Sequence, residues 1–168
     1  MSPLWVVPAS LIVDQVTKLV VMQTMMRNQS ISVLGDVFRL TYIHNSGAAF
    51  GLNLGSPALH TLVSIVALAA LAWLFRTSPA ENRVMRVSLC LILGGALGNI
   101  VDRLRLSEVV DFLDFGIGTL RWPVFNVADS CVTVGIVLLA LSYSRQDRKQ
   151  AEARRDDSSP PEEQVVGG

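Results

Sequence analysis

The stretch Val84-Met-Arg-Val-Ser-Leu-Cys-Leu-Ile-Leu-Gly-Gly-Ala-Leu-Gly-Asn-Ile-Val-Asp-Arg103 decides the fold of this 168-residue chain. Its part up to Val101 is apolar and has a length that crosses a bilayer, about 17 to 25 residues. Gly94 and Gly98 form a GxxxG step, which lets two membrane helices approach closely. The stretch therefore predicts a close-packed membrane helix with polar residues at one end.

Three more apolar segments approach the same length, so we expect four spans at about 4–26, 59–75, 84–101 and 124–143. The composition agrees, with 51% hydrophobic and 17% charged residues, because soluble domains carry about 25% charged residues. The net charge is zero, which argues against a nucleic-acid partner. We expect a membrane all-α four-helix bundle that forms one domain over residues 1–145.

Basic residues predict the orientation of the bundle. The loop between the second and third spans holds Arg76, Arg83 and Arg86, and the last span is followed by another basic cluster (Arg145, Arg148, Lys149, Arg154 and Arg155). Because basic residues favour the cytoplasmic side, we expect both termini in the cytoplasm. The charged residues 146–168, with Pro160 and Pro161, predict a disordered cytoplasmic tail.

The two segments on the opposite side differ from plain linkers. Residues 31–50 are rich in β-branched and aromatic residues and alternate in character, with Gly35 and Gly47 as turn points. They predict short strands in a small β-rich cradle on the membrane surface. The partly apolar segment from Leu104 to Pro123 is expected to lie along the membrane interface.

Ionisable residues at membrane depth are costly and normally face the bundle interior. Asp14 and Lys18 lie four residues apart in the first span, so they can pair with each other or line a buried site. The segment from Asn45 to Gly51 is small and polar, and fits either a turn or a binding loop. In the third span Asn99 and Arg103 indicate a site role, while Asp102 fits an anchor between helices.

Two further carboxylates point to chemistry. Asp111 lies in the apolar tetrapeptide Val109-Val-Asp-Phe, and Asp129 follows 18 residues later at the start of the last span, three residues after Asn126. Two aspartates that meet resist double ionisation, so one keeps a proton at neutral pH. One could then activate water while the other polarises a carbonyl. A proton relay in a transporter, or a scaffold packed by polar pairs, remains open on the residues alone.

No metal or cofactor is expected. His44 and His60 are the only histidines, and neither shows metal-ligand spacing with Cys90 or Cys131. His44, beside Asn45, is interpreted as a loop residue.

Five motifs in order resemble the lipoprotein signal peptidase family, the type II signal peptidases. They are Asp14-Gln-x-Thr-Lys18, Asn45-x-Gly47-Ala-Ala-Phe50, Gly94-Gly-x-x-Gly98-Asn99-x-x-Asp102-Arg103, Val110-Asp111-Phe112 and Phe125-Asn126-x-Ala-Asp129. The resemblance spans most of the chain from Asp14 to Asp129, and no motif position departs from the family pattern.

The resemblance implies an aspartyl peptidase whose catalytic pair is Asp111 and Asp129. It implies a substrate-binding set of Asp14, Lys18, Asn45, Gly47, Asn99, Arg103 and Asn126. The implied substrate is a prolipoprotein that carries diacylglycerol on a cysteine, cut just before that cysteine at the periplasmic face of the bacterial inner membrane. The family also implies a periplasmic cradle with a short interfacial helix. We expect a monomer, since all the catalytic groups lie on one chain.

Overall fold

The structure is a computed structural model that describes residues 2–46 and 57–157, with side chains as far as Arg145 except that of Pro57. A short 3-10 turn (η1, Pro3–Trp5) leads into α1 (Val6–Thr24), and α2 (Pro57–Thr77), α3 (Arg83–Leu106) and α4 (Val127–Asp157) follow. Four stretches are long and apolar enough to cross a membrane: Pro3–Thr24, Ala58–Thr77, Arg83–Leu106 and Val127–Arg145. These four helices coincide, within about five residues at each end, with the four segments predicted to be spans.

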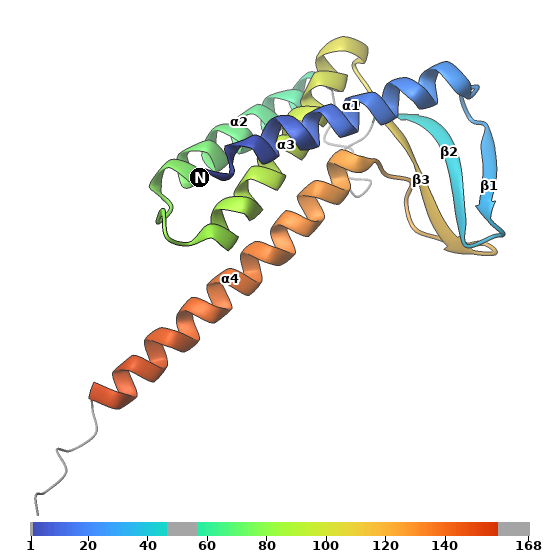
Figure 1. Cartoon of the computed structure of the whole chain (residues 1–168). Coiled ribbons are helices and arrows are strands. Elements are labelled where there is room, and N and C mark those ends of the chain that lie inside the picture. Colours follow the sequence, from blue (N-terminus) through green and yellow to red (C-terminus); the bar gives the residue numbers. More distant parts are fainter. Residues whose placement is uncertain (1, 47–56, 158–168) are drawn as a thin grey trace, which may run out of the picture.

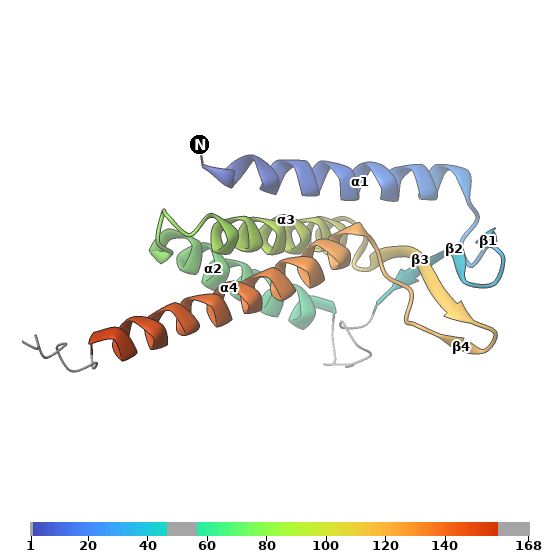
Figure 2. The ribbon, with the colours of Figure 1, turned by 60° about the horizontal axis from the view of Figure 1, so that its bottom comes forward.

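Helix α3 is the centre of the bundle, with α1 and α4 packed on different sides of it and α2 beside it (Figure 2). It is also the most buried of the four apolar helices, whereas the outer faces of the others expose large apolar side chains such as Ile12, Val66 and Val137. Such faces are suited to contact with lipid tails.

The glycines of α3 explain this close packing. A methyl group on Gly95 would collide with the backbone oxygen of Ala128 on α4. On Gly98 it would lie 2.5 Å from Oδ2 of Asp14 on α1. Gly94, the first residue of the GxxxG step, faces the backbone oxygen of Val7 on α1. The three glycines thus let the α1 and α4 backbones and the Asp14 carboxylate approach α3 closely.

A four-stranded antiparallel sheet lies at one end of the bundle (Figure 1). Its strands are β1 (Ser30–Leu34), β2 (Phe38–Asn45), β3 (Val109–Ile117) and β4 (Leu120–Arg121), in that spatial order. The first two confirm the short strands predicted within residues 31–50, of which the structure describes those up to Ser46. Gly35 has a positive φ of 52° in the turn between them.

The second outer segment differs from the sequence-based expectation. We expected the segment from Leu104 to Pro123 to lie along the membrane interface and to correspond to the family's short interfacial helix, but Val109–Ile117 is a strand. Its run of β-branched and aromatic residues favours extended backbone, and pairing with β2 gives that backbone hydrogen-bond partners. The prediction of a helix there was wrong.

Helix α4 also continues past the predicted start of the tail at residue 146 and ends at Asp157. Residues 146–157 are rich in Ala, Glu, Gln, Lys and Arg, which favour helix. Residues 158–168 lie outside the described part of the chain.

Candidate active site

Asp111 lies on β3, where the sheet meets the bundle, and its side chain is almost fully buried, at 2% exposure. Asn45, the last residue of β2, donates a hydrogen bond to its Oδ2 over 2.9 Å. Asn126 donates to its Oδ1 over 2.7 Å. Both oxygens of this carboxyl group are therefore held by side-chain amides.

The segment before α4 brings the second aspartate to the same place. Phe125 pairs with Leu113 on β3 through hydrogen bonds in both directions, so the chain enters α4 directly beside the strand of Asp111. Asp129 then lies in the first turn of the helix, three residues into it.

Asn126 and Asp129 form a reciprocal cap at the start of α4. The side-chain oxygen of Asn126 accepts from the backbone N–H of Asp129 over 2.9 Å. Oδ2 of Asp129 accepts from the backbone N–H of Asn126 over 3.3 Å. This is the geometry of a capping box, in which each residue satisfies a free donor of the other. The Asn126-x-x-Asp129 spacing therefore shapes the helix start and places a carboxylate at it.

Two amides connect the carboxylates. Asn99 on α3 donates to Oδ1 of Asp129 over 2.7 Å. Asn126 donates from one nitrogen to Oδ1 of Asp111 and, over 3.1 Å, to the side-chain oxygen of Asn99. Asp111 and Asp129 thus belong to one hydrogen-bonded network built from β3, α3 and α4.

Lys18 supports this network from α1. Its ammonium group contacts Oδ2 of Asp14 at 2.9 Å, Oδ2 of Asp102 at 2.7 Å and the side-chain oxygen of Asn99 at 2.9 Å. The three acceptors match the three hydrogens of the ammonium group. Because the side-chain oxygen of Asn99 accepts a hydrogen bond from Lys18, the amide group is oriented with its nitrogen toward Asp129.

Both Asp14 and Lys18 are buried, at 0% and 1% exposure. Asp14 also accepts the backbone N–H of Ala128, in the first turn of α4, over 2.8 Å. These two residues were expected among the substrate-binding residues. Their burial leaves no surface for contact with a substrate in this conformation, and their bonds run to the residues that hold Asp129.

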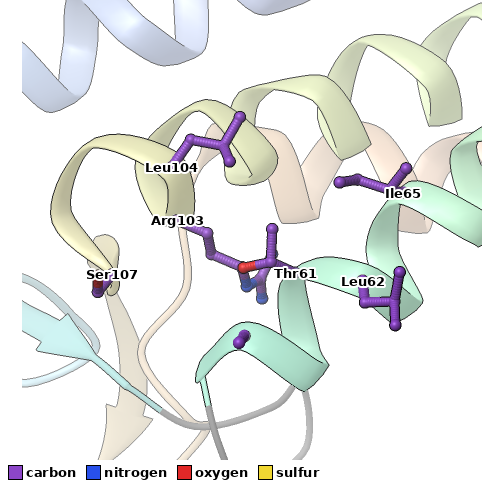
Figure 3. Close-up of a pocket in the computed structure, with 7 residues that line it drawn as sticks. Thr61, Leu62, Ile65, Arg103, Leu104 and Ser107 are labelled. Carbon is purple, nitrogen blue, oxygen red and sulfur yellow. The ribbon is translucent and has the colours of Figure 1, made fainter.

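Arg103 lies beside the network rather than within it. Its charge interacts with those of Asp129, Asp111 and Asp102. Figure 3 shows its side chain reaching from α3 toward Thr61 on α2. It lines a cavity of about 390 Å³ whose other walls are Ala58, Thr61, Leu62, Ile65, Leu104 and Ser107. The cavity therefore combines apolar walls with one guanidinium group.

Burial raises the pKa of Asp111 from its ordinary value of 3.8 to about 7. The hydrogen bond from Asn45 lowers this pKa, the negative charge of Asp129 raises it, and the bond from Asn126 and the charge of Lys18 lower it. Desolvation is the largest of these effects. Asp111 therefore exchanges a proton near neutral pH, as an acid–base catalyst must.

The structure brings together most of the residues that the sequence singled out. Asp14, Lys18, Asn45, Asn99, Asp111, Asn126 and Asp129 share one network, and Arg103 lies next to it. Gly47 lies outside the described residues.

Sequence reasoning missed several supporting contacts. Gln15 donates to Asp14, to the backbone oxygen of Gly98 and to Asp102. Asp102 accepts the backbone N–H of Val110, the neighbour of Asp111, over 3.2 Å. His44 is a strand residue rather than a loop residue, and both its ring nitrogens are engaged. The i, i+2 spacing of Tyr42 and His44 on β2 was the signal available for the last of these.

Comparison with known proteins gives a consistent result. A family model described as signal peptidase (SPase) II matches residues 6–145. A lipoprotein signal peptidase of Geobacter metallireducens is 45% identical over 151 residues, which cover 88% of this chain and 93% of that protein. A lipoprotein signal peptidase of Moorella thermoacetica is 44% identical over 133 residues, which cover 77% of this chain and 83% of that protein.

Two solved structures, both described as bacterial membrane enzymes, resemble the fold. One, at 2.3 Å resolution, has a TM-score of 0.76 and 32% identity, over 97% of this chain and 93% of that one. The other, at 1.9 Å, has a TM-score of 0.76 and 35% identity, over 84% and 91% of the two chains.

Proposed function

Because this chain belongs to the signal peptidase II family, we propose that it is an aspartyl endopeptidase that removes the signal peptide from diacylglyceryl-modified prolipoproteins. The cut falls just before the lipid-bearing cysteine. The observation that carries the proposal is the network in which Asn126 donates to Asp111 while its backbone N–H donates to Asp129.

The proposed mechanism follows from this arrangement. Asp111, with a pKa of about 7, is suited to hold the one proton of the pair at neutral pH. It donates that proton to the oxygen of the scissile carbonyl while Asp129 takes a proton from the attacking water. The C–O bond forms and gives a tetrahedral diol. As the C–N bond breaks, Asp129 returns its proton to the leaving amine and Asp111 takes a hydroxyl proton back, so the carbonyl re-forms and the pair again holds one proton.

The asparagines, Arg103 and Gly47 have different proposed roles. Asn45, Asn99 and Asn126 donate hydrogen bonds to the two carboxylates. Their side-chain amides can also hydrogen-bond the backbone of a substrate in a site where water is scarce. Arg103 presents several donors in a cavity with apolar walls, which suits a substrate carbonyl next to lipid. Gly47 is retained as a proposed substrate-binding residue.

The orientation of the bundle in the membrane is proposed from the course of the chain and the position of its basic residues. The chain begins at the end of the bundle away from the sheet and α4 runs back toward that end (Figure 1). With the basic residues Arg76, Arg83, Arg86 and Arg145 at that end, we place it in the cytoplasm and the sheet at the periplasmic face of the inner membrane. A prolipoprotein held in the bilayer would then meet the site at membrane-surface depth.

The test is a cleavage reaction with purified protein in detergent. A diacylglyceryl-modified prolipoprotein should lose its signal peptide, and mass spectrometry should find the lipidated cysteine as the new first residue. The same precursor without lipid should stay uncut. Cleavage of both precursors, or a cut elsewhere in the chain, would contradict the proposed specificity.

A further inference from the structure

A cluster of polar residues lies at the end of β2, next to Asn45. His44 hydrogen-bonds through Nε2 to the hydroxyl of Tyr42 at 2.7 Å and through Nδ1 to Oε2 of Glu108 at 2.8 Å. Arg27, in the connection between α1 and β1, bonds both carboxylate oxygens of Glu108 at 3.2 and 3.3 Å. We call these four residues the strand clamp.

The contact with Glu108 shows that Nδ1 of His44 carries a hydrogen. A carboxylate only accepts hydrogen bonds, so Nδ1 carries the hydrogen that Glu108 accepts. The bonds from His44, followed by the charge of Arg27, lower the pKa of Glu108, which keeps it ionised. Tyr42 is 7% exposed and packs in the cluster of Val21, Met25, Val110 and Phe112, so one end of the clamp is anchored in the core.

The clamp closes across the strand pair that carries the site. Glu108 immediately precedes β3, and Asn45 pairs with Val109, the first residue of that strand. His44 pairs with Val110, and Ile43 with Asp111. The His44–Glu108 bond thus links the C-terminal end of β2 to the start of β3. Each of its two residues is the chain neighbour of a residue in the Asn45–Val109 pair.

This position matters because Asn45 is the terminal residue of its strand. Strand ends open locally with little cost unless other contacts hold them. A side chain that must sit within hydrogen-bond distance of a reacting group depends on such support. Asn45 holds Oδ2 of Asp111 at 2.9 Å, so fraying at its backbone would release the carboxyl group.

We propose that His44 and Glu108 are positioning residues, which hold the end of β2 so that Asn45 stays on Asp111. The inference rests on the proposed function for its activity readout, although its structural readout does not. His44 acts through Asn45 and does not touch the reacting atoms.

The experiment compares His44→Ala, Asn45→Ala and the double variant in detergent. Removing Asn45 deletes a hydrogen bond that lowers the pKa of Asp111, so the Asp111 midpoint should rise, by about one pH unit. His44→Ala should raise it in the same direction. In the double variant, loss of His44 should add nothing to the loss of Asn45, because its effect passes through that residue.

Two readouts follow the same midpoint. One is the pH dependence of prolipoprotein cleavage; the other is a titration of carbon-13-labelled aspartate by NMR, with the Asp111 signal assigned by its absence in Asp111→Asn. Glu108→Leu removes both carboxylate oxygens, and with them the acceptor for Nδ1 of His44, so it tests the clamp if His44→Ala fails to fold. Thr41→Val is the matched control, since it deletes a β2 hydrogen bond that runs to Asp114 instead.

The outcomes are separable. The inference is supported if His44→Ala or Glu108→Leu shifts the Asp111 titration, Thr41→Val does not, and the shift vanishes in the Asn45→Ala background. It is overturned if the folded clamp variants leave the titration unchanged or shift it equally with Asn45 absent. A titration shift in a protein that cuts no prolipoprotein would keep the clamp and reject the proposed function.

Discussion

At the scale of single residues, the site combines groups whose charge states depend on each other. Asp111 is buried against two amides, near Asp129, while Lys18 compensates part of the charge beneath them. The side chains that donate to the two aspartates are the uncharged amides of Asn45, Asn99 and Asn126. Such preorganised donors are effective where water is excluded.

Asp111 should make the folded protein less stable as pH rises. Its pKa is about 7 when folded, against an ordinary 3.8, so between these values the folded state binds more protons than the unfolded one. Stability contributed by the proton is present below about pH 4 and is lost as pH rises through about 7. Asp111→Asn cannot ionise there. Thermal unfolding in detergent should therefore show the variant gaining stability over wild type as pH rises from 4 to 8.

Lys18→Met should be strongly destabilising. The change leaves Asp14 and Asp102 buried together without their shared cation. Removing one partner from a buried ion pair costs about 3–5 kcal/mol. Arg39→Met is the control, because it breaks a partly exposed pair with Asp36 and surface pairs contribute little. Equal unfolding temperatures for the two variants would contradict the role assigned to Lys18.

At the scale of elements, α3 is the helix against which the site is assembled. It supplies Asn99, Asp102 and Arg103 on the turns that follow its glycines. The start of α4 rests on this helix, since Ala128 faces both Gly95 and Gly98. The position of Asp129 therefore depends on the distance between two helix backbones.

Gly95→Ala should lower both stability and cleavage. The added methyl group meets the Ala128 backbone oxygen, which cannot move without shifting the first turn of α4 and Asp129. Overpacking of this kind costs about 1–3 kcal/mol. Ala69→Val is the control, because Ala69 lies on an exposed face of α2. Cleavage by Gly95→Ala at the wild-type rate would show that the helix spacing is not needed.

Sequence patterns predicted the helices better than they predicted the outer segments. The spans follow from apolar length alone, and the glycine spacing of α3 specifies close packing. The helix expected within residues 104–123 fails because the pairing of β3 with β2 depends on residues some 70 positions earlier, such as Ile43 opposite Asp111. The β-branched and aromatic residues of β3 favour a strand locally, but the partner strand and its register carry no local signal.

The site shows the same division. Asp111, Asp129 and the three amides could be singled out as polar residues in apolar surroundings. The supporting role of Asp14 and Lys18 could not be predicted, since their burial appears only when α1, α3 and α4 are packed. The contact between His44 and Glu108 likewise depends on strand register.

At the scale of the whole molecule, the bundle has one end that carries the sheet and another that carries the α2–α3 connection and the N-terminus (Figure 1). The active-site network lies at the sheet end, where β3 meets the first turn of α4. This polarity fits a substrate that is anchored in the bilayer and cut at its surface.

The proposed orientation can be tested by thiol labelling. Ser32 is exposed on β1 and Ala80 is exposed between α2 and α3. An impermeant thiol reagent should label Ser32→Cys in cells whose outer membrane is permeabilised. It should label Ala80→Cys only after the inner membrane is broken. The unsubstituted protein controls for Cys90 and Cys131, and the reverse pattern would invert the topology.

The most direct test of the central claim compares cleavage by wild type, Asp111→Asn, Asp129→Asn and Asp114→Asn. Asp114 is the matched control, since it lies on the same strand as Asp111, is 5% exposed and bonds Thr41 and Arg121 away from the pair. With a diacylglyceryl-modified prolipoprotein, wild type and Asp114→Asn should release the signal peptide. Folded Asp111→Asn and Asp129→Asn should release none. Cleavage by either of these two variants at the wild-type rate would contradict the assignment of the catalytic pair.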